Sequence, residues 1–169
     1  MRRWLGAGIS GLALCTGPIG AAVFDNDEEK SWVEQEAPLP AFPKTEDLIV
    51  FNAGAATSNR FQIDPASIGV GADGVVRFTL VVRSSSGAEN ISFEGIRCST
   101  RERKAYAFGR PEHTWSAARS PRWVQIRAND LNNHYSVLYF DHFCRDGRMV
   151  RNREIAIRSL KWGPAPRGD

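Results

Sequence analysis

Cys98 and Cys144 are the residues of this 169-residue chain whose chemistry must be assigned first. A cysteine can act as a nucleophile, bind a metal or form a disulfide, and the compartment of the protein largely decides between these roles. The chain has no CxxC motif, and its three scattered histidines do not complete the closely spaced four-ligand set of a structural zinc site. A disulfide and a free buried thiol therefore remain, and export would favour the disulfide.

The first residues of the chain show the pattern of a secretory signal peptide. Arg2 and Arg3 precede an apolar, glycine-rich run that ends at Ala22, and an acidic segment begins at Asp25. This order, with small residues before the cleavage point, is typical of an exported protein. We therefore expect residues 1–22 to be removed, which leaves no transmembrane segment in the mature chain.

A retained membrane anchor and a lipoprotein are the two alternatives to cleavage. A retained membrane anchor would need a spanning helix, and five glycines and Pro18 make this run a poor one. A lipoprotein would be lipidated on Cys15, but Leu14 stands where that processing needs a small residue. If cleavage occurs after Ala22 as expected, Cys15 is removed with the signal peptide. Two cysteines then remain in an exported chain, which indicates a disulfide between Cys98 and Cys144.

Four charged residues crowd one expected hairpin. Arg83 and Arg97 could form a cationic pair that binds a carboxylate or phosphate, so they are candidate anion-binding residues. The alternative is a set of cross-strand ion pairs with Glu89 and Glu94, each contributing roughly 0.2–1 kcal/mol. The sequence favours the ion pairs.

A small hydrolase is the enzymatic alternative. His134, Asp141 and His142 lie close in sequence and could form a triad with one of Ser84–Ser86. No G-x-S-x-G nucleophile elbow supports this reading. The two histidines are eight residues apart, too far along a helix to share one metal ion easily. We therefore assign no catalytic residue, no metal site and no cofactor.

The elements that must position these residues begin with the stretch VVRFTLVVR at residues 75–83. Its alternation predicts a half-buried strand with two faces. One face holds Val76, Phe78, Leu80 and Val82, and the other holds Arg77, Thr79, Val81 and Arg83. With a turn at Asp73-Gly74 and strands after it, residues 67–109 predict an antiparallel meander.

The C-terminal part predicts helices. Residues 132–144 are ambiguous between helix and strand, and we choose helix. Asn152 as a cap and Gly163 as a stop predict a second helix between them. We expect an α+β domain over residues 48–163, an antiparallel β-sheet with two or three C-terminal helices packed on one face, and a tail at 164–169.

Residues 23–47 form an acidic and then proline-rich arm. Prolines lack a backbone donor and favour an extended path, so the arm can lie over the domain or bind a partner. The expected anchors are Trp32, Leu39 and Phe42.

Charge is unevenly distributed along the chain. Residues 23–100 hold 6 basic and 12 acidic side chains, whereas residues 101–169 hold 14 basic and 7 acidic ones. This could indicate a basic face for nucleic acid or anionic lipid. No nucleic-acid-binding motif accompanies the arginines, so we expect no nucleic acid partner and favour packing of the acidic part on the basic part, or solvation of both.

Several motifs resemble one known family. The stretches LPAFPKTEDLIVF, ATSNRF, GADGVVRFTLVVRSSSGAENISFEGIRC and YAFGR resemble, in that order, the CNP1-like family of small exported proteins of Gram-negative bacteria. The resemblance covers roughly residues 32–162 and implies a periplasmic location, but no activity, cofactor or catalytic residue. We expect a non-enzymatic binding or accessory module of the cell envelope, stabilised by one disulfide, whose partner is an envelope protein or an anionic ligand.

Overall fold

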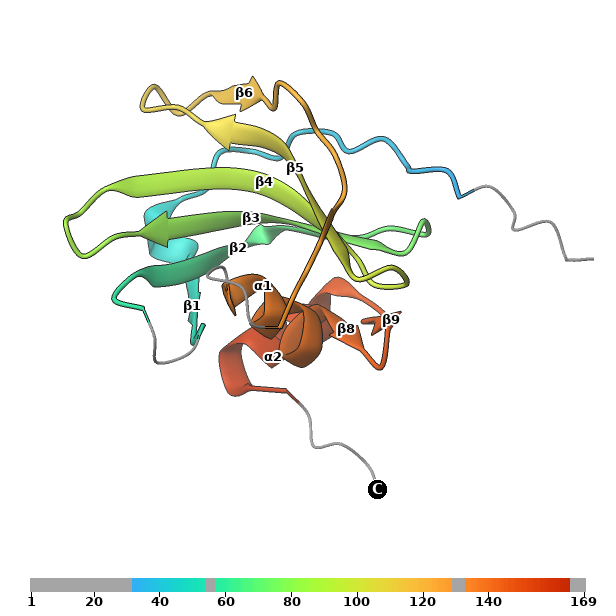
Figure 1. Cartoon of the computed structure of the whole chain (residues 1–169). Coiled ribbons are helices and arrows are strands. Elements are labelled where there is room, and N and C mark those ends of the chain that lie inside the picture. The colour runs from blue at the N-terminus through green and yellow to red at the C-terminus, as the bar shows by residue number, and fades with distance from the viewer. Residues whose placement is uncertain (1–31, 54–56, 129–132, 165–169) are drawn as a thin grey trace, which may run out of the picture. The chain divides into compact units, whose positions relative to one another are not determined.

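Alternating strands joined by short turns build one antiparallel sheet. The computed structural model describes residues 32–53, 57–128 and 133–164, so the expected signal peptide at 1–22 lies outside the described residues. The strands of the sheet are β1 (Ile49–Phe51), β2 (Arg60–Val70), β3 (Val75–Arg83), β4 (Glu89–Arg97), β5 (Glu102–Gly109), β6 (Trp115–Ala117) and β7 (Val124–Gln125). In the part of the chain described, they lie in the order β1-β2-β3-β4-β5-β6, with β7 also paired to β5 (Figure 1). The expected antiparallel meander is confirmed.

Strand β2 continues through Pro65, although proline usually interrupts a strand. The register with β3 shifts between Asp64 and Gly69, and the proline lies within this bulge. Proline has no N–H to donate, and at this position the ladder requires no hydrogen bond from it. Local bonds hold the bulge together. The Ala66 N–H donates to Oδ1 of Asp64 at 2.9 Å, and the Ser67 hydroxyl donates to the Asp64 carbonyl at 2.8 Å.

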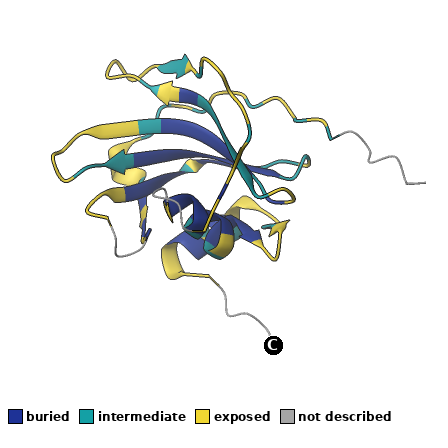
Figure 2. Ribbon diagram, viewed as in Figure 1, coloured by how far each residue is buried: buried dark blue, intermediate teal, exposed yellow. Residues whose placement is uncertain are grey.

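Residues of the sheet and of the C-terminal helical segments belong to one hydrophobic core cluster. The ring centres of Phe78 on β3 and Phe143 lie 5.0 Å apart, and both side chains are fully buried. The same cluster of buried residues includes Val76, Leu80, Ile96, Leu138, Ala156 and Leu160. Figure 2 shows this burial as the dark band through the middle of the strands and helices.

The expectation of a half-buried central strand is wrong. Arg77, Thr79 and Val81, predicted to face solvent, are 7%, 0% and 1% exposed. Part of the reason is the arm, because Nη2 of Arg77 donates to the backbone oxygen of Gln35 at 2.9 Å. The other part is the neighbouring strand, since Thr79 stands opposite the buried Phe93 on β4. Both faces of β3 are therefore covered.

The C-terminal elements are helical, as expected, with one irregularity. Helix α1 (Asn133–Val137) continues as a π-helical segment (Leu138–Phe143), and the short hairpin β8 (Cys144–Arg145) and β9 (Arg148–Met149) follows. Helix α2 (Arg153–Trp162) begins where the Asn152 side chain accepts a hydrogen bond from the Ile155 N–H at 3.0 Å. The choice of helix over strand is confirmed for residues 133–143, as is the α+β class. Residue 132 lies outside the described residues, and Cys144 begins β8.

Candidate functional site

A cavity of about 720 Å³ opens on the core-side face of the sheet, near the hairpin that joins β3 to β4. Parts of β2, β3, β4 and β5 line it, together with the first turn of α1. Its apolar wall includes Phe61, Leu80, Val82 and Ile91. We call it the Glu94 cavity, after the carboxyl group among its lining residues.

Strand register explains why a charged residue faces this cavity. Glu94 stands directly opposite Phe78 in the β3–β4 ladder, and directly opposed residues project to the same side of a sheet. Its side chain therefore shares the face of the hydrophobic core, and the residue is only 3% exposed. Sequence reasoning treated Glu94 as half of a surface ion pair. The burial of Glu94 could have been predicted from the pairing of its strand with the apolar face of residues 76–82.

The two oxygens of Glu94 have different environments. Its Oε1 accepts hydrogen bonds from the Ser92 hydroxyl at 2.5 Å and from the Tyr135 hydroxyl at 3.0 Å. Its Oε2 is buried and has no hydrogen-bond partner among the described residues. A buried polar atom without a partner is uncommon in folded proteins.

Electrostatics keep this carboxyl group from ionising as easily as an exposed one. Burial raises the pKa of Glu94, and the hydrogen bonds from Ser92 and Tyr135 and the charge of Arg103 only partly oppose that rise. The Arg103 guanidinium lies over the Tyr135 ring, 4.1 Å from its centre. Burial also raises the pKa of Tyr135, and the charge of Glu94 adds to it. Both groups are thus held toward their neutral, protonated forms.

His134 belongs to the wall of the same cavity. Its ring stacks on Phe61 with centres 4.6 Å apart, and it lies 4.0 Å from the ring of Tyr135. The cavity thus brings together one carboxyl group, aromatic faces and an imidazole. Such a set can bind a small ligand by hydrogen bonds and ring contacts.

The structure does not bring the candidate anion-binding arginines together. Arg83 stands opposite Glu89 at the hairpin end of the ladder, where its Nε forms an ion pair with the Glu89 carboxylate. Arg97 lies at the other end of β4, opposite Val75. The cross-strand ion pair that the sequence offered as the alternative is present at Arg83.

The residues proposed for a hydrolase are also distributed over separate places. Asp141 and His142 line a second cavity, of about 760 Å³, that does not include His134. None of Ser84–Ser86 lines either cavity. The Ser84 and Ser86 hydroxyls instead hydrogen bond to each other at 2.8 Å in the β3–β4 turn.

A histidine–serine contact that the sequence did not predict occurs between α2 and the π-helical segment. Nδ1 of His142 lies 2.9 Å from Oγ of Ser159, and that hydroxyl donates to the backbone oxygen of Asp141 at 3.0 Å. Because the hydroxyl hydrogen is directed at the carbonyl, the network assigns the Nδ1 hydrogen to His142. Burial lowers the pKa of His142, which favours this neutral ring. The pair therefore connects two helical segments and does not present an activated serine.

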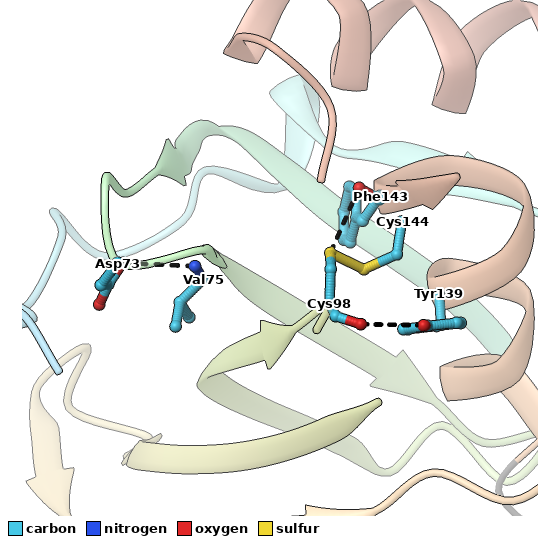
Figure 3. The surroundings of a disulfide bond; sticks show 6 residues. All are labelled: Asp73, Val75, Cys98, Tyr139, Phe143 and Cys144. Carbon is cyan, nitrogen blue, oxygen red and sulfur yellow. Dashed lines mark hydrogen bonds between the residues drawn. A yellow bond between two sulfur atoms is a disulfide. The ribbon is translucent and has the colours of Figure 1, made fainter. Parts of the chain in front are cut away.

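The expected disulfide between Cys98 and Cys144 is present (Figure 3). The two Cα atoms are 5.3 Å apart, within the usual range for a bridged pair. The Tyr139 hydroxyl donates to the Cys98 backbone oxygen at 2.9 Å, and Sγ of Cys98 lies 3.7 Å from the Phe143 carbonyl oxygen. The bond joins the end of β4 to the end of the π-helical segment.

Residue Glu34 attaches the arm to the face of the sheet opposite the core. Its carboxylate accepts hydrogen bonds from Lys104 at 2.7 Å, from the Tyr106 hydroxyl at 2.8 Å and from the Trp123 indole at 3.3 Å. Burial alone would raise the pKa of Glu34, but these bonds outweigh it and lower the pKa. Farther along the arm, Phe42 packs against Trp115 with ring centres 5.3 Å apart.

Metal-binding clusters and membrane-spanning helices are both absent from the described ranges 32–53, 57–128 and 133–164. In these ranges no group of three or more histidine, cysteine, aspartate or glutamate side chains gathers closely enough to hold a metal ion. No helix in them has the length and apolar character needed to cross a bilayer.

Comparison with known proteins gives one match. The model of the CNP1-like family matches residues 27–161, most of the chain, in agreement with the family that the sequence motifs resemble. No curated protein and no solved structure matches the chain.

Proposed function

The chain belongs to the CNP1-like family, and from the geometry of its Glu94 cavity we propose that it is an exported, non-enzymatic binding protein that takes up a small ligand there. Family membership itself assigns no ligand. The observation that carries the proposal is the buried, unpartnered Oε2 of Glu94 among the residues that line the cavity.

The form of the cavity supports binding. Its volume of about 720 Å³ falls within the range of roughly 300–1,000 Å³ that is typical of small-molecule sites. The proposal takes both C-terminal helices to pack on one face of the sheet, which the contact between Phe78 and Phe143 supports. The cavity is then the part of that face that the core packing leaves open.

The residues present do not favour a reaction in this cavity. The Ser92 hydroxyl donates to Glu94 and is not paired with a histidine. The His134 ring stacks on the Phe61 ring. Acyl transfer needs a nucleophile beside a group that can accept its proton. Burial raises the pKa of Glu94 and so favours its protonated form, which cannot act as that base toward Ser92, and we therefore favour binding over hydrolysis.

We place this function in the periplasm. The charge and hydropathy order of residues 1–22 supports export, and the Cys98–Cys144 disulfide is of the kind that persists in oxidising compartments. Intact-mass measurement on the exported protein is expected to show a chain that begins at or near Val23. A mass that includes a lipid on Cys15 would contradict this placement.

The binding proposal is tested with a fragment library and the mature protein. Nuclear magnetic resonance spectra of methyl groups should show ligands that shift Leu80, Val82 and Ile91 together, since all three line the cavity. The variant Val82→Phe fills the cavity and should abolish the shifts of the two reporters that remain, Leu80 and Ile91. The matched variant Val124→Phe adds the same ring at an exposed position on β7 and should leave them intact.

Two outcomes would contradict a ligand-binding function. One is a screen in which no fragment shifts the three methyl groups together. The other is a set of ligands that bind Val82→Phe as tightly as the original protein, because these would occupy another site.

A further inference from the structure

We infer that the ligand of the Glu94 cavity carries a protonated amine, and that its ammonium group donates a hydrogen bond to Oε2 of Glu94. This inference rests on the proposed function, since it names the chemical class of the ligand in the same cavity. It starts from the unequal use of the two carboxyl oxygens.

Glu94 is surrounded by donors on one side and by none on the other. Oε1 accepts from Ser92 at 2.5 Å and from Tyr135 at 3.0 Å, while Oε2 has no partner among the described residues. Two donors directed at one oxygen stabilise the ionised form of a carboxyl group. An ammonium group carries three donors and no acceptor, so it matches the oxygen that lacks a hydrogen-bond partner.

The charges that face Glu94 leave room for one more cation. Its ladder neighbours, Phe78 on β3 and Ala105 on β5, carry no charge. From α1 comes the hydroxyl of Tyr135, and from β5 comes the positive charge of Arg103, which lies over the Tyr135 ring. The charge of Arg103 lowers the pKa of Glu94, but Oε2 accepts no hydrogen bond from it in the described structure.

The remaining wall suits an amine with an apolar or aromatic body. Phe61 and Leu80 provide apolar surface, and the faces of aromatic rings attract cations. His134 in the same wall is the group that would oppose a cation if it became protonated. Together these features favour an amine with an apolar or aromatic body.

The pairing has a consequence for protons. Burial raises the pKa of Glu94, so below that pKa the empty cavity holds a protonated carboxyl group. An ammonium group binds the ionised form, and each binding event therefore releases one proton. The affinity for an amine should fall about tenfold for each pH unit below the pKa of Glu94.

Three probes of similar shape and different charge test the inference on the mature protein. Phenethylamine supplies an ammonium group, phenethyl alcohol a neutral hydroxyl and hydrocinnamate a carboxylate. Titrations followed on the methyl groups of Leu80 and Val82 should show the amine binding about tenfold or more tightly than the alcohol, as expected for a hydrogen bond to a charged group. Hydrocinnamate should bind most weakly, and calorimetry in buffers of different ionisation enthalpy should detect the released proton.

A pair of variants isolates the role of the carboxylate. Glu94→Gln retains the shape and removes the charge, so it should reduce the amine to the affinity of the alcohol. Glu102→Gln changes a carboxylate on β5 that does not line the cavity, and it should preserve the tenfold preference. Thermal unfolding of both variants shows whether they remain folded.

Each contrary result has a distinct meaning. If the alcohol or the carboxylate shifts the cavity methyl groups as strongly as the amine, or if Glu94→Gln retains the preference, the inference is wrong while a binding function stands. If no probe shifts these methyl groups, the inference is also wrong, and the fragment screen then decides the binding function independently.

Discussion

The Tyr135 hydroxyl donates a 3.0 Å hydrogen bond to Oε1 of Glu94, and this contact joins helix α1 to strand β4 inside the protein. Both side chains are at least nine-tenths buried. Burial of a charge is costly unless the charge is paired, and the second oxygen of Glu94, Oε2, has no hydrogen-bond partner among the described residues.

Removal of that donor should change the titration of Glu94. Tyr135→Phe keeps the ring and deletes the hydroxyl, so the ionised carboxylate loses a stabilising bond and the pKa of Glu94 should rise further. The free energy of unfolding should fall by about 1 kcal/mol. Carbon-detected titration of the Glu94 carboxyl group measures the shift. An unchanged pKa would show that this bond does not act on the carboxylate.

The charge of Glu94 should oppose folding as the pH rises. Burial raises its pKa in the folded state, so its contribution to stability is complete below the ordinary glutamate pKa of about 4.3 and is lost as pH rises through the folded value. Glu94→Gln cannot ionise and should escape this loss. Urea unfolding between about pH 4 and pH 8 should show the variant gaining relative to the original protein. Parallel curves would contradict the raised pKa.

Thr79 offers a test of burial on the second face of the sheet. Its hydroxyl is buried and has no hydrogen-bond partner among the described residues. Thr79→Val keeps the branched shape and removes the unsatisfied group, so it should stabilise the protein by about 1 kcal/mol. Thr100→Val alters an exposed threonine and should change stability by less than about 0.5 kcal/mol. If chemical denaturation shows that Thr79→Val destabilises the protein, the hydroxyl has a partner or this face is open to water.

The attachment of the arm should depend on Glu34 and on pH. Glu34→Ala removes the acceptor for Lys104, Tyr106 and Trp123, so amide hydrogens of residues 33–43 should exchange faster. Because the pKa of Glu34 is lowered, its contribution is complete above the ordinary glutamate pKa and is lost as pH falls through the folded value. The exposed Glu36 supplies the control, since Glu36→Ala should leave exchange unchanged. Equal exchange in both variants would mean that other contacts hold the arm.

The disulfide should contribute a large part of the stability. Cys98 and Cys144 are separated by 46 positions, and closure of a loop of this length stabilises the folded state by at most about 4 kcal/mol in the chain-entropy model. The paired change to serine at both positions should lower the free energy of unfolding by an amount approaching that value. Thiol labelling of the oxidised, denatured mature protein should find no free cysteine, and two labelled thiols per chain would contradict the bond.

Local features of the fold could be predicted because they depend on near neighbours in the sequence. Alternation over residues 75–83 indicates a strand, whatever the strand packs against. Gly74 supplies the positive φ of 81° that the turn before this strand requires. The Asn152 side chain can cap only the helix that follows it. The cysteine pairing was expected from counting, because the predicted removal of a signal peptide would leave two cysteines.

The site could not be predicted because it depends on contacts between distant segments. Alternation says that β3 has two faces, but only the register with β4 sets Glu94 opposite Phe78 and so inside the protein. Only the folded arm brings Gln35 to Arg77 and helps to cover the face that alternation assigned to solvent. The sequence by itself determined the strands, the helices and the disulfide, since each follows from local pattern or composition. The tertiary structure alone decided which charged side chain is buried, because burial is a property of the neighbours that folding brings into contact.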